Sequence, residues 1–280
     1  MTDVAGSPLD SGTESPERTP LARRAILSHL AAGNIGSRLF VLDEIDSTNS
    51  FLQRLPEGEA TEGTVAVAEY QTAGRGRHGR VWVAPPRANL LFSVLLGRPG
   101  QPLGLVTLAG AVSVVEALGE RGIDVGLKWP NDVVSKGRKL AGVLCETRSD
   151  SQSGSKLILG IGVNVNLRAA DRPEDLRTTA TSTMELVGSA FDRNELLGEI
   201  LNRLQIHWDS LRMGEPQPLI ATARGKCETL GRRVRVKVGE SIVAGLASDL
   251  DGSGRLILRM DNGEQRILEI GEITYLSSVG

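Results

Sequence analysis

Along the first two thirds of the chain, apolar residues recur in short runs that alternate with polar turns, a pattern that predicts the strands of a sheet. The expected strands cover residues 40–45, 65–68, 89–96, 126–128, 140–146 and 157–165. Longer apolar or amphipathic stretches predict helices at 21–32, ended by Gly33, at 102–118, and from Asp192 towards Gly214. Because strands and helices alternate unevenly, they favour an α+β fold, a mixed sheet backed by helices on one side.

The periodicity changes beyond about residue 225. Residues 233–238 alternate charged and apolar side chains, and strand-like runs follow at 242–247, 256–259 and 265–270 with glycines between them. This pattern predicts a small antiparallel barrel. At the other end, residues 1–19 hold few large apolar side chains, which predicts a disordered tail. We therefore expect a tail at 1–19, a main domain at 20–224 and a C-terminal barrel at 225–280.

Composition limits the function more than the fold. The 280 residues are 40% hydrophobic and 24% charged, and the net charge of -2 gives no overall field that would attract nucleic acid. No apolar run approaches the roughly 20 residues of a membrane span, and the first residues are too polar for a signal peptide, so we expect a cytoplasmic protein. Cys145 and Cys227 form no paired motif and the three histidines are scattered, so we expect no metal site built from side chains.

A glycine-rich loop gives the first indication of function. It reads Gly74-Arg75-Gly76-Arg77-His78-Gly79, in which glycines allow close backbone approach and two arginines can bind an anion. The loop matches the pattern G-x-G-x-x-G-x-V, but prolines follow where a dinucleotide-binding fold opens a helix, and the kinase motifs H-R-D and D-F-G do not occur. Anion binding is the favoured interpretation, and a solvated turn is the alternative.

Three more segments carry groups suited to a ligand site. Lys128-Trp129-Pro130-Asn131-Asp132 places a cation, an amide and a carboxylate before a turn at 135–138. Gly160-Ile161-Gly162-Val163-Asn164 alternates small and apolar residues, as a strand does where a ligand or another backbone lies against it. Ser47-Thr48-Asn49 offers residues favoured at a helix N-terminus, where the same groups can face a ligand. Each segment also has a purely structural alternative: a surface lysine, a crowded strand and a helix cap.

In this order and spacing, these segments, with Gln71 and Lys139-Leu140-Ala141-Gly142, resemble the biotin protein ligase family. The resemblance covers roughly residues 40–280. It implies a mixed, mainly antiparallel sheet of the class II aminoacyl-tRNA synthetase and biotin ligase type, followed by a C-terminal SH3-like barrel. It also implies ATP-dependent activation of biotin to biotinyl-5'-AMP, with Mg²⁺, and transfer to a lysine of a biotin carboxyl carrier domain. The winged-helix domain of repressor-type members is missing, which implies a monofunctional ligase that binds neither DNA nor membrane.

The resemblance also assigns roles to residues. The residues implied for biotin binding are Ser47, Thr48, Asn49, Gln71, Gly74, Arg75, Gly76, Arg77, Trp82, Lys128, Gly142, Gly160 and Gly162. Those implied for ATP binding are Arg77, Trp82, Lys128, Asn131 and Asn164, with Mg²⁺ carried by the ATP. Joining a carboxylate to a phosphate brings two anions together, so Lys128, Arg75 and Arg77 are the expected catalytic cations. His78 stands where many members of this family have arginine, which implies that the glycine loop binds the adenylate less tightly.

Alternatives remain at this point. A lipoate or octanoate protein ligase shares the fold type, but its arginine-and-triple-glycine signature does not occur here. A biotin-dependent repressor would bind DNA first and act as an enzyme second, and a third alternative is a pocket protein that has lost catalysis. The glycine loop is expected to be mobile without ligand. The sequence leaves open the oligomeric state, the order of substrate binding, the preferred carrier domain and any role of the tail.

Overall fold

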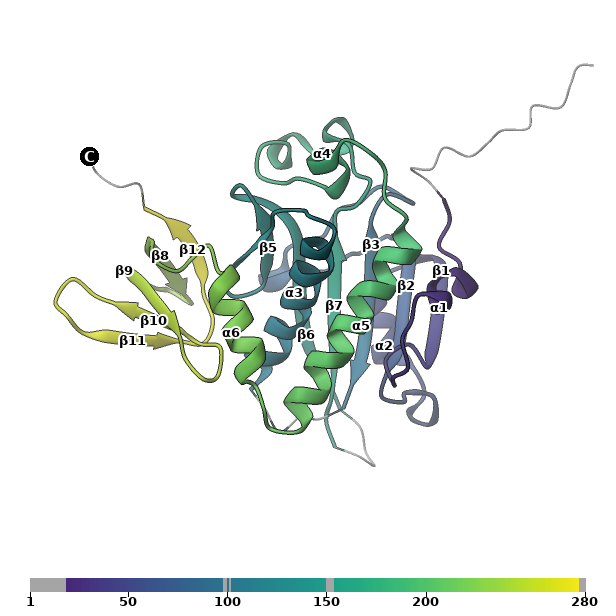
Figure 1. The fold of residues 1–280 in the computed structure, drawn as a ribbon, viewed down its shortest axis with the longest axis horizontal. Coiled ribbons are helices and arrows are strands. Elements are labelled where there is room, and N and C mark those ends of the chain that lie inside the picture. The colour runs from purple at the N-terminus through teal and green to yellow at the C-terminus, as the bar shows by residue number, and fades with distance from the viewer. Residues whose placement is uncertain (1–18, 98–99, 101, 150–153, 277–280) are drawn as a thin grey trace, which may run out of the picture.

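The computed structural model describes residues 19–97, 100, 102–149 and 154–276, which contain two β-sheets (Figure 1). The larger sheet has the strand order β1-β2-β3-β7-β6-β5-β4. Its strands are β1 (Arg38–Ile45), β2 (Thr64–Gln71), β3 (Leu90–Leu96), β4 (Gly126–Lys128), β5 (Asp132–Ser135), β6 (Arg138–Arg148) and β7 (Lys156–Val163). β1 and β2 are parallel and the other neighbouring pairs are antiparallel. The predicted mixed, mainly antiparallel sheet is therefore confirmed. The predicted tail lies outside the described residues, except for Thr19.

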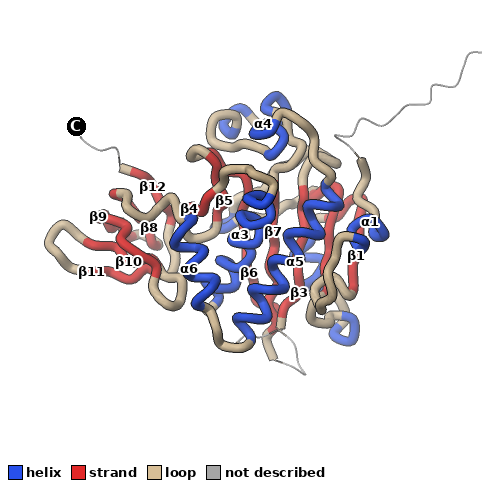
Figure 2. Tube along the Cα trace, viewed as in Figure 1, coloured by secondary structure: helices blue, strands red, loops and turns tan. Residues whose placement is uncertain are grey.

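Helices α3 (Leu103–Glu120) and α5 (Arg193–Arg212) run side by side over one face of this sheet, as Figures 1 and 2 show. By length and composition α3 could span a membrane, with a mean hydropathy of 1.5, but 67% of it is buried between the sheet and its neighbours. Burial therefore accounts for its apolar composition. The N-terminus of α5 is capped by Asp192, whose carboxylate accepts hydrogen bonds from the backbone N–H groups of Asn194 and Glu195.

Helix α2 (Thr48–Arg54) lies on the opposite face of the sheet and is an exception to the expected one-sided arrangement. A Cβ added at Gly160 of β7 would meet Asn49 of α2, whereas the side chain of Ile161, the next residue, packs against Gly110 of α3. Successive strand residues point to opposite faces, so α2 and α3 flank the sheet from two sides. A small separate core beneath α2 includes Leu52, Leu55, Ala66, Leu95 and Ile158.

The N-terminal helix is shorter than the pattern predicts, because α1 covers only Arg23–Ser28. The chain beyond it is held by side chains of α5 instead of by helical carbonyls. Asn202 accepts a hydrogen bond from the backbone of Ala31, and Gln205 accepts from the backbone of Asn34 and Ile35. Tertiary hydrogen bonds thus replace the last expected helical turn.

A buried ion pair fixes the start of the described chain to the main sheet. Arg193 of α5 donates to the Glu69 carboxylate of β2 at 2.6 Å, and the two side chains are 1% and 5% exposed. Glu69 also accepts from the backbone N–H of Leu21, and Arg193 donates to the carbonyl of Thr19. The charged groups are therefore paired and hydrogen-bonded, as burial requires.

The C-terminal sheet is antiparallel, with the strand order β11-β10-β9-β8-β12. Its strands are β8 (Arg233–Val238), β9 (Ser241–Leu250), β10 (Leu256–Arg259), β11 (Gln265–Leu268) and β12 (Glu272–Tyr275). The predicted last strand ends at Leu268, and β12 is an additional strand that lies beside β8. Helix α6 (Gln217–Lys226) precedes this sheet and packs on α3 and β9; α6, β5 and α4 (Thr183–Val187) were not predicted.

Candidate active site

Two adjoining cavities lie on the face of the main sheet that carries α2. The larger, of about 990 Å³, opens between the main sheet and β12. The smaller, of about 30 Å³, lies between the N-terminus of α2 and the strands β3, β6 and β7. The glycine loop crosses both, since Arg75 lines the small cavity, Arg77 the large one and Trp82 both. The two cavities thus meet at one loop.

The floor of the small cavity is a continuous chain of polar contacts. Gln71 Oε1 accepts from the backbone N–H of Thr48 at 2.7 Å, and Thr48 Oγ1 lies 2.7 Å from Ser93 Oγ. Ser93 donates to Asn49 Oδ1 at 2.5 Å, and Asn49 Nδ2 donates to Glu146 Oε2 at 2.7 Å. Four segments distant in sequence therefore form one polar surface, buried at Thr48, Asn49 and Ser93, that can match a small polar ligand.

Trp82 closes the small cavity over two glycines. A Cβ added at Gly162 would stand 2.7 Å from Trp82 Cε2, and one added at Gly142 would stand 3.1 Å from Trp82 Cζ3. The indole Nε1 is buried without a hydrogen-bond partner among the described residues. A volume of about 30 Å³ matches one water molecule, so a larger ligand must displace the indole or lift the loop.

The residues expected to bind biotin or ATP are distributed over both cavities. Of the residues expected to bind biotin, those that line the small cavity are Ser47, Thr48, Asn49, Gln71, Arg75, Trp82, Gly160 and Gly162. Gly76, Arg77 and Lys128 line the large cavity. Gly74 and Gly142 appear in neither lining; the carbonyl of Gly74 accepts from the backbone N–H of Trp82, and Gly142 contacts the indole. All five residues expected to bind ATP line the large cavity.

The large cavity gathers several cations. Arg77 donates to Asn131 Oδ1 at 2.8 Å, and burial lowers the pKa of its guanidinium below the usual value. Lys128 Nζ lies 5.2 Å from the ring centroid of Tyr275, a cation–π contact with β12. Burial raises the pKa of the Tyr275 hydroxyl. Lys128 therefore lies at the side of the cavity that the C-terminal sheet forms.

Lys139 is a second lysine at this site. From the sequence it was named only as part of the Lys139-Leu140-Ala141-Gly142 motif, without a role of its own. It is the second residue of β6 and lines the large cavity, and its Nζ lies 5.5 Å from the Trp82 ring centroid, at the junction with the small cavity. Its Nζ pairs with Asp132 at 2.7 Å. The strand register that brings Lys139 beside Trp82 could not be read from the sequence, because the loop and β6 are far apart along the chain.

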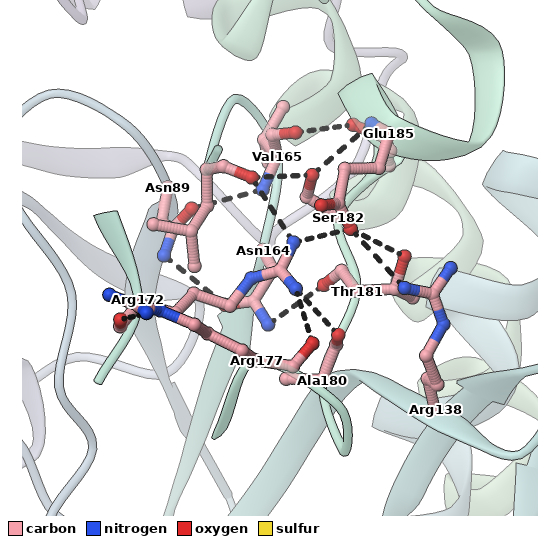
Figure 3. A network of polar contacts seen from close by, with 12 residues as sticks. Asn89, Arg138, Asn164, Val165, Arg172, Arg177, Ala180, Thr181, Ser182 and Glu185 are labelled. Carbon is pink, nitrogen blue, oxygen red and sulfur yellow. Dashed lines mark hydrogen bonds and ion pairs between the residues drawn. The ribbon is translucent and has the colours of Figure 1, made fainter. Parts of the chain in front are cut away.

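Asn164 belongs to a polar network that shapes the wall of the large cavity (Figure 3). Its amide donates to the carbonyl of Thr181 and accepts from Asn89, so both ends of the side chain are occupied. In the same network Arg172, whose side chain is 2% exposed, pairs with Glu185, which also accepts from Thr181. This network holds the segment after β7 in place, and neither Arg172 nor Glu185 was predicted.

Neither metal nor thiol chemistry is built into the described residues. Among them, no group of three or more His, Cys, Asp or Glu side chains could hold a metal ion. Burial and the adjacent Glu146 carboxylate raise the pKa of the Cys145 thiol to about 12. That thiol is therefore protonated at neutral pH and a poor nucleophile.

Comparison with known proteins shows to which family a chain with this architecture belongs. Residues 41–164 match the model of the Biotin/lipoate A/B protein ligase family, and residues 229–274 match the Biotin protein ligase C terminal domain. The biotin--[acetyl-CoA-carboxylase] ligase of Mycobacterium tuberculosis is 36% identical over 269 residues, which cover 92% of this chain and 97% of that protein. The chain belongs to the biotin protein ligase family.

Solved structures of this family agree with that assignment. The Aquifex aeolicus biotin protein ligase in complex with biotin and ATP aligns with a TM-score of 0.76 and 34% identity, covering 86% of this chain and all of that one. Among the relatives found by sequence, the bifunctional ligase/repressor BirA of Salmonella typhimurium is 34% identical over a segment that covers 84% of this chain and 72% of that protein. The main sheet and the C-terminal sheet of this family member are thus both family features.

Proposed function

We propose that this chain activates biotin with ATP, forming biotinyl-5'-AMP, and transfers the biotinyl group to a lysine of a carboxylase carrier domain. The observation that carries the proposal is the pair of adjoining cavities joined at Trp82, one with a fixed polar floor and one wide enough for a nucleotide. Membership of the biotin protein ligase family and the likeness to a structure that holds biotin and ATP support it.

The chemistry requires two anions to meet. A biotin carboxylate oxygen attacks the α-phosphorus of ATP, a new C–O–P linkage forms, and pyrophosphate leaves with the electrons of the broken P–O bond. Fixed cations lower the repulsion and stabilise the charge on the leaving group. Arg77, Lys128 and Lys139 all line the large cavity and are candidates for that role.

Lys139 is better placed than Lys128 to contact the reacting carboxylate. Lys139 lies beside Trp82, which borders both cavities, whereas Lys128 lies over the Tyr275 ring on the side of β12. We therefore assign Lys139 to the junction where the carboxylate and the α-phosphate meet. Lys128 is assigned to the phosphates further out.

Mg²⁺ is proposed to arrive with the ATP phosphates. Magnesium sites of this kind usually use one or two carboxylates together with phosphate oxygens and water. The described residues form no cluster of three such side chains, but Asp132, Asp171 and Glu272 each line the large cavity, so a single carboxylate is available to a metal that the nucleotide brings. When bound, the ion would neutralise phosphate charge. Asp132 would then exchange its pairing with Lys139 for a metal or water contact.

The second step needs an intermediate protected from water. The amine of the carrier lysine attacks the biotinyl carbonyl, an amide forms and AMP leaves. Trp82 and the loop at 74–80 cover the junction of the cavities, and they are the elements proposed to exclude water from the mixed anhydride. We assign catalysis to residues 20–224 and an accessory role to 225–280, whose Glu272 and Thr274 complete the large cavity.

The decisive experiment incubates the purified chain with labelled biotin, Mg-ATP and a carboxylase carrier domain, and repeats it with lipoate. Transfer of biotin, and not of lipoate, to the carrier is the expected result. Lipoate transfer would favour the lipoate ligase alternative, and binding of biotin without pyrophosphate release would indicate a protein without catalysis. A gel shift with a biotin operator tests the repressor alternative, for which we expect no shift.

A further inference from the structure

Glu146 lies at the end of the polar floor and can only accept hydrogen bonds. Its Oε1 accepts from Arg75 of the glycine loop at 2.6 Å, and its Oε2 accepts from Asn49 Nδ2 at 2.7 Å. A carboxylate beside a guanidinium has no proton to give, so both contacts have a fixed direction. Glu146 is not among the residues that line the small cavity and was not expected to belong to the site.

The direction of the Asn49–Glu146 bond fixes the direction of the side-chain bonds through Asn49, Ser93 and Thr48. Because Asn49 turns its Nδ2 towards Glu146, its Oδ1 faces Ser93, and the Ser93 hydroxyl must donate to it. Ser93 Oγ can then only accept from Thr48 Oγ1 across their 2.7 Å contact. The single hydroxyl proton of Thr48 is thus committed to Ser93, although Gln71 Oε1 lies 3.1 Å away.

The groups left for a ligand then have a defined polarity. Asn49 keeps one N–H, Gln71 keeps its amino group, and Thr48 Oγ1 keeps lone pairs that can accept. A cyclic urea presents the complement, one carbonyl oxygen that accepts and two N–H groups that donate. The buried Asn49 amide cannot be re-oriented without leaving a donor facing a donor, which is costly away from water.

We propose that Glu146 is a positioning residue that sets the hydrogen-bond polarity of the small cavity and so selects a ureido ligand. It acts through Asn49, Ser93 and Thr48 and need not touch the ligand. The inference rests on the proposed function, because it takes the small cavity to be the biotin site. It deepens that function by naming the group that makes the floor specific.

Glu146→Gln is the informative substitution, because glutamine keeps the volume but can donate. Its amino group can face Asn49 while its oxygen still accepts from Arg75. The Asn49 amide then turns its Oδ1 towards the glutamine and its Nδ2 towards Ser93. The Ser93 hydroxyl must then donate to Thr48 Oγ1, which reverses the direction of the hydrogen bonds along the floor. We expect the Kd of biotin to rise about tenfold, the effect of losing one good hydrogen bond. The KM for biotin should rise in parallel while kcat at saturating biotin stays within about twofold, as for lost uniform binding.

Calorimetry with biotin and with desthiobiotin tests the polarity directly. Desthiobiotin keeps the ureido group and lacks the sulfur-containing ring, so both ligands should lose affinity by the same factor in Glu146→Gln. Loss for biotin alone would overturn the proposal. Glu44→Gln is the matched control, since Glu44 is an exposed carboxylate on β1, and it should bind as the parent does.

A double-mutant cycle with Ser93→Ala tests transmission along the floor. Removing the Ser93 hydroxyl interrupts the chain, so Glu146→Gln should weaken biotin binding less in that background than in the parent. Additive effects would overturn the proposal, as would an unchanged Kd in a Glu146→Gln variant with the parent's melting temperature. If the parent neither binds biotin nor exchanges pyrophosphate, the proposed function fails. If only the cycle or the ligand comparison fails, the function stands and this inference does not.

Discussion

Replacing Gly162 by alanine should weaken biotin binding, because the added Cβ takes space over β7 that Trp82 fills in this structure and that a ligand displacing the indole would need. A Cβ at this position would stand 2.7 Å from Trp82 Cε2 and 2.8 Å from Cζ2. Carbon atoms pack at about 3.5–4.0 Å, so the indole must move by about 1 Å. The backbone N–H of Trp82 donates to Gly74, and the shift is therefore passed to the glycine loop.

The cost follows from overpacking of this one contact. An added methyl group in a well-packed site costs about 1–3 kcal/mol. Without ligand the indole can move off the methyl group together with its loop, so we expect little of this cost to reach the global free energy of unfolding. A ligand held against β7 meets the methyl group directly, so we expect most of the cost to oppose ligand binding. About 1.4 kcal/mol corresponds to a factor of ten, so the Kd of biotin should rise by about tenfold to a hundredfold.

The assay is calorimetric titration of biotin into the parent and into Gly162→Ala, with thermal unfolding of both proteins. Gly104→Ala is the matched control, because the nearest atom to its added Cβ, the carbonyl oxygen of Ser253, is 3.8 Å away. Gly104 lies in the first turn of α3, where alanine should stabilise the fold by about 0.4–1 kcal/mol and leave biotin affinity unchanged. Parent-like biotin affinity in Gly162→Ala would refute the reasoning that the ligand lies against Gly162.

Three further predictions concern other parts of the molecule. Lys139→Ala should lose biotin-dependent pyrophosphate exchange by about a hundredfold or more, and more than Lys128→Ala does; a larger loss in Lys128→Ala would reverse their assigned roles. Arg193→Met should lower the free energy of unfolding by about 3–5 kcal/mol, measured in urea, since it leaves Glu69 buried and unpaired; a change below 1 kcal/mol would contradict this. Cys145, with its pKa raised to about 12, should react with a thiol reagent at pH 8 far more slowly in the native protein than after unfolding.

Local sequence determined much of the fold. The apolar runs predicted six strands of the main sheet and the helices α3 and α5. They could do so because a strand or helix that buries one face repeats its apolar residues with the period of that element. The alternation at 233–238 likewise placed β8. β5, β12 and α6 went unpredicted because they are short or weakly patterned, and their partners along the sheet or on α3 stabilise them. The first helix was predicted too long because contacts with Asn202 and Gln205 override its local preference.

Local motifs also determined which residue types gather at the site, since the glycine loop, the helix start at Ser47 and the paired glycines of β7 all carry their own signals. Only the tertiary structure decided how they meet. Strand register and the path of the loop placed Lys139 beside Trp82 and joined Glu146 to both Asn49 and Arg75. Those contacts join residues between 57 and 97 positions apart in the sequence. No local pattern encodes them, because the folded geometry decides which groups become hydrogen-bond and ion-pair partners.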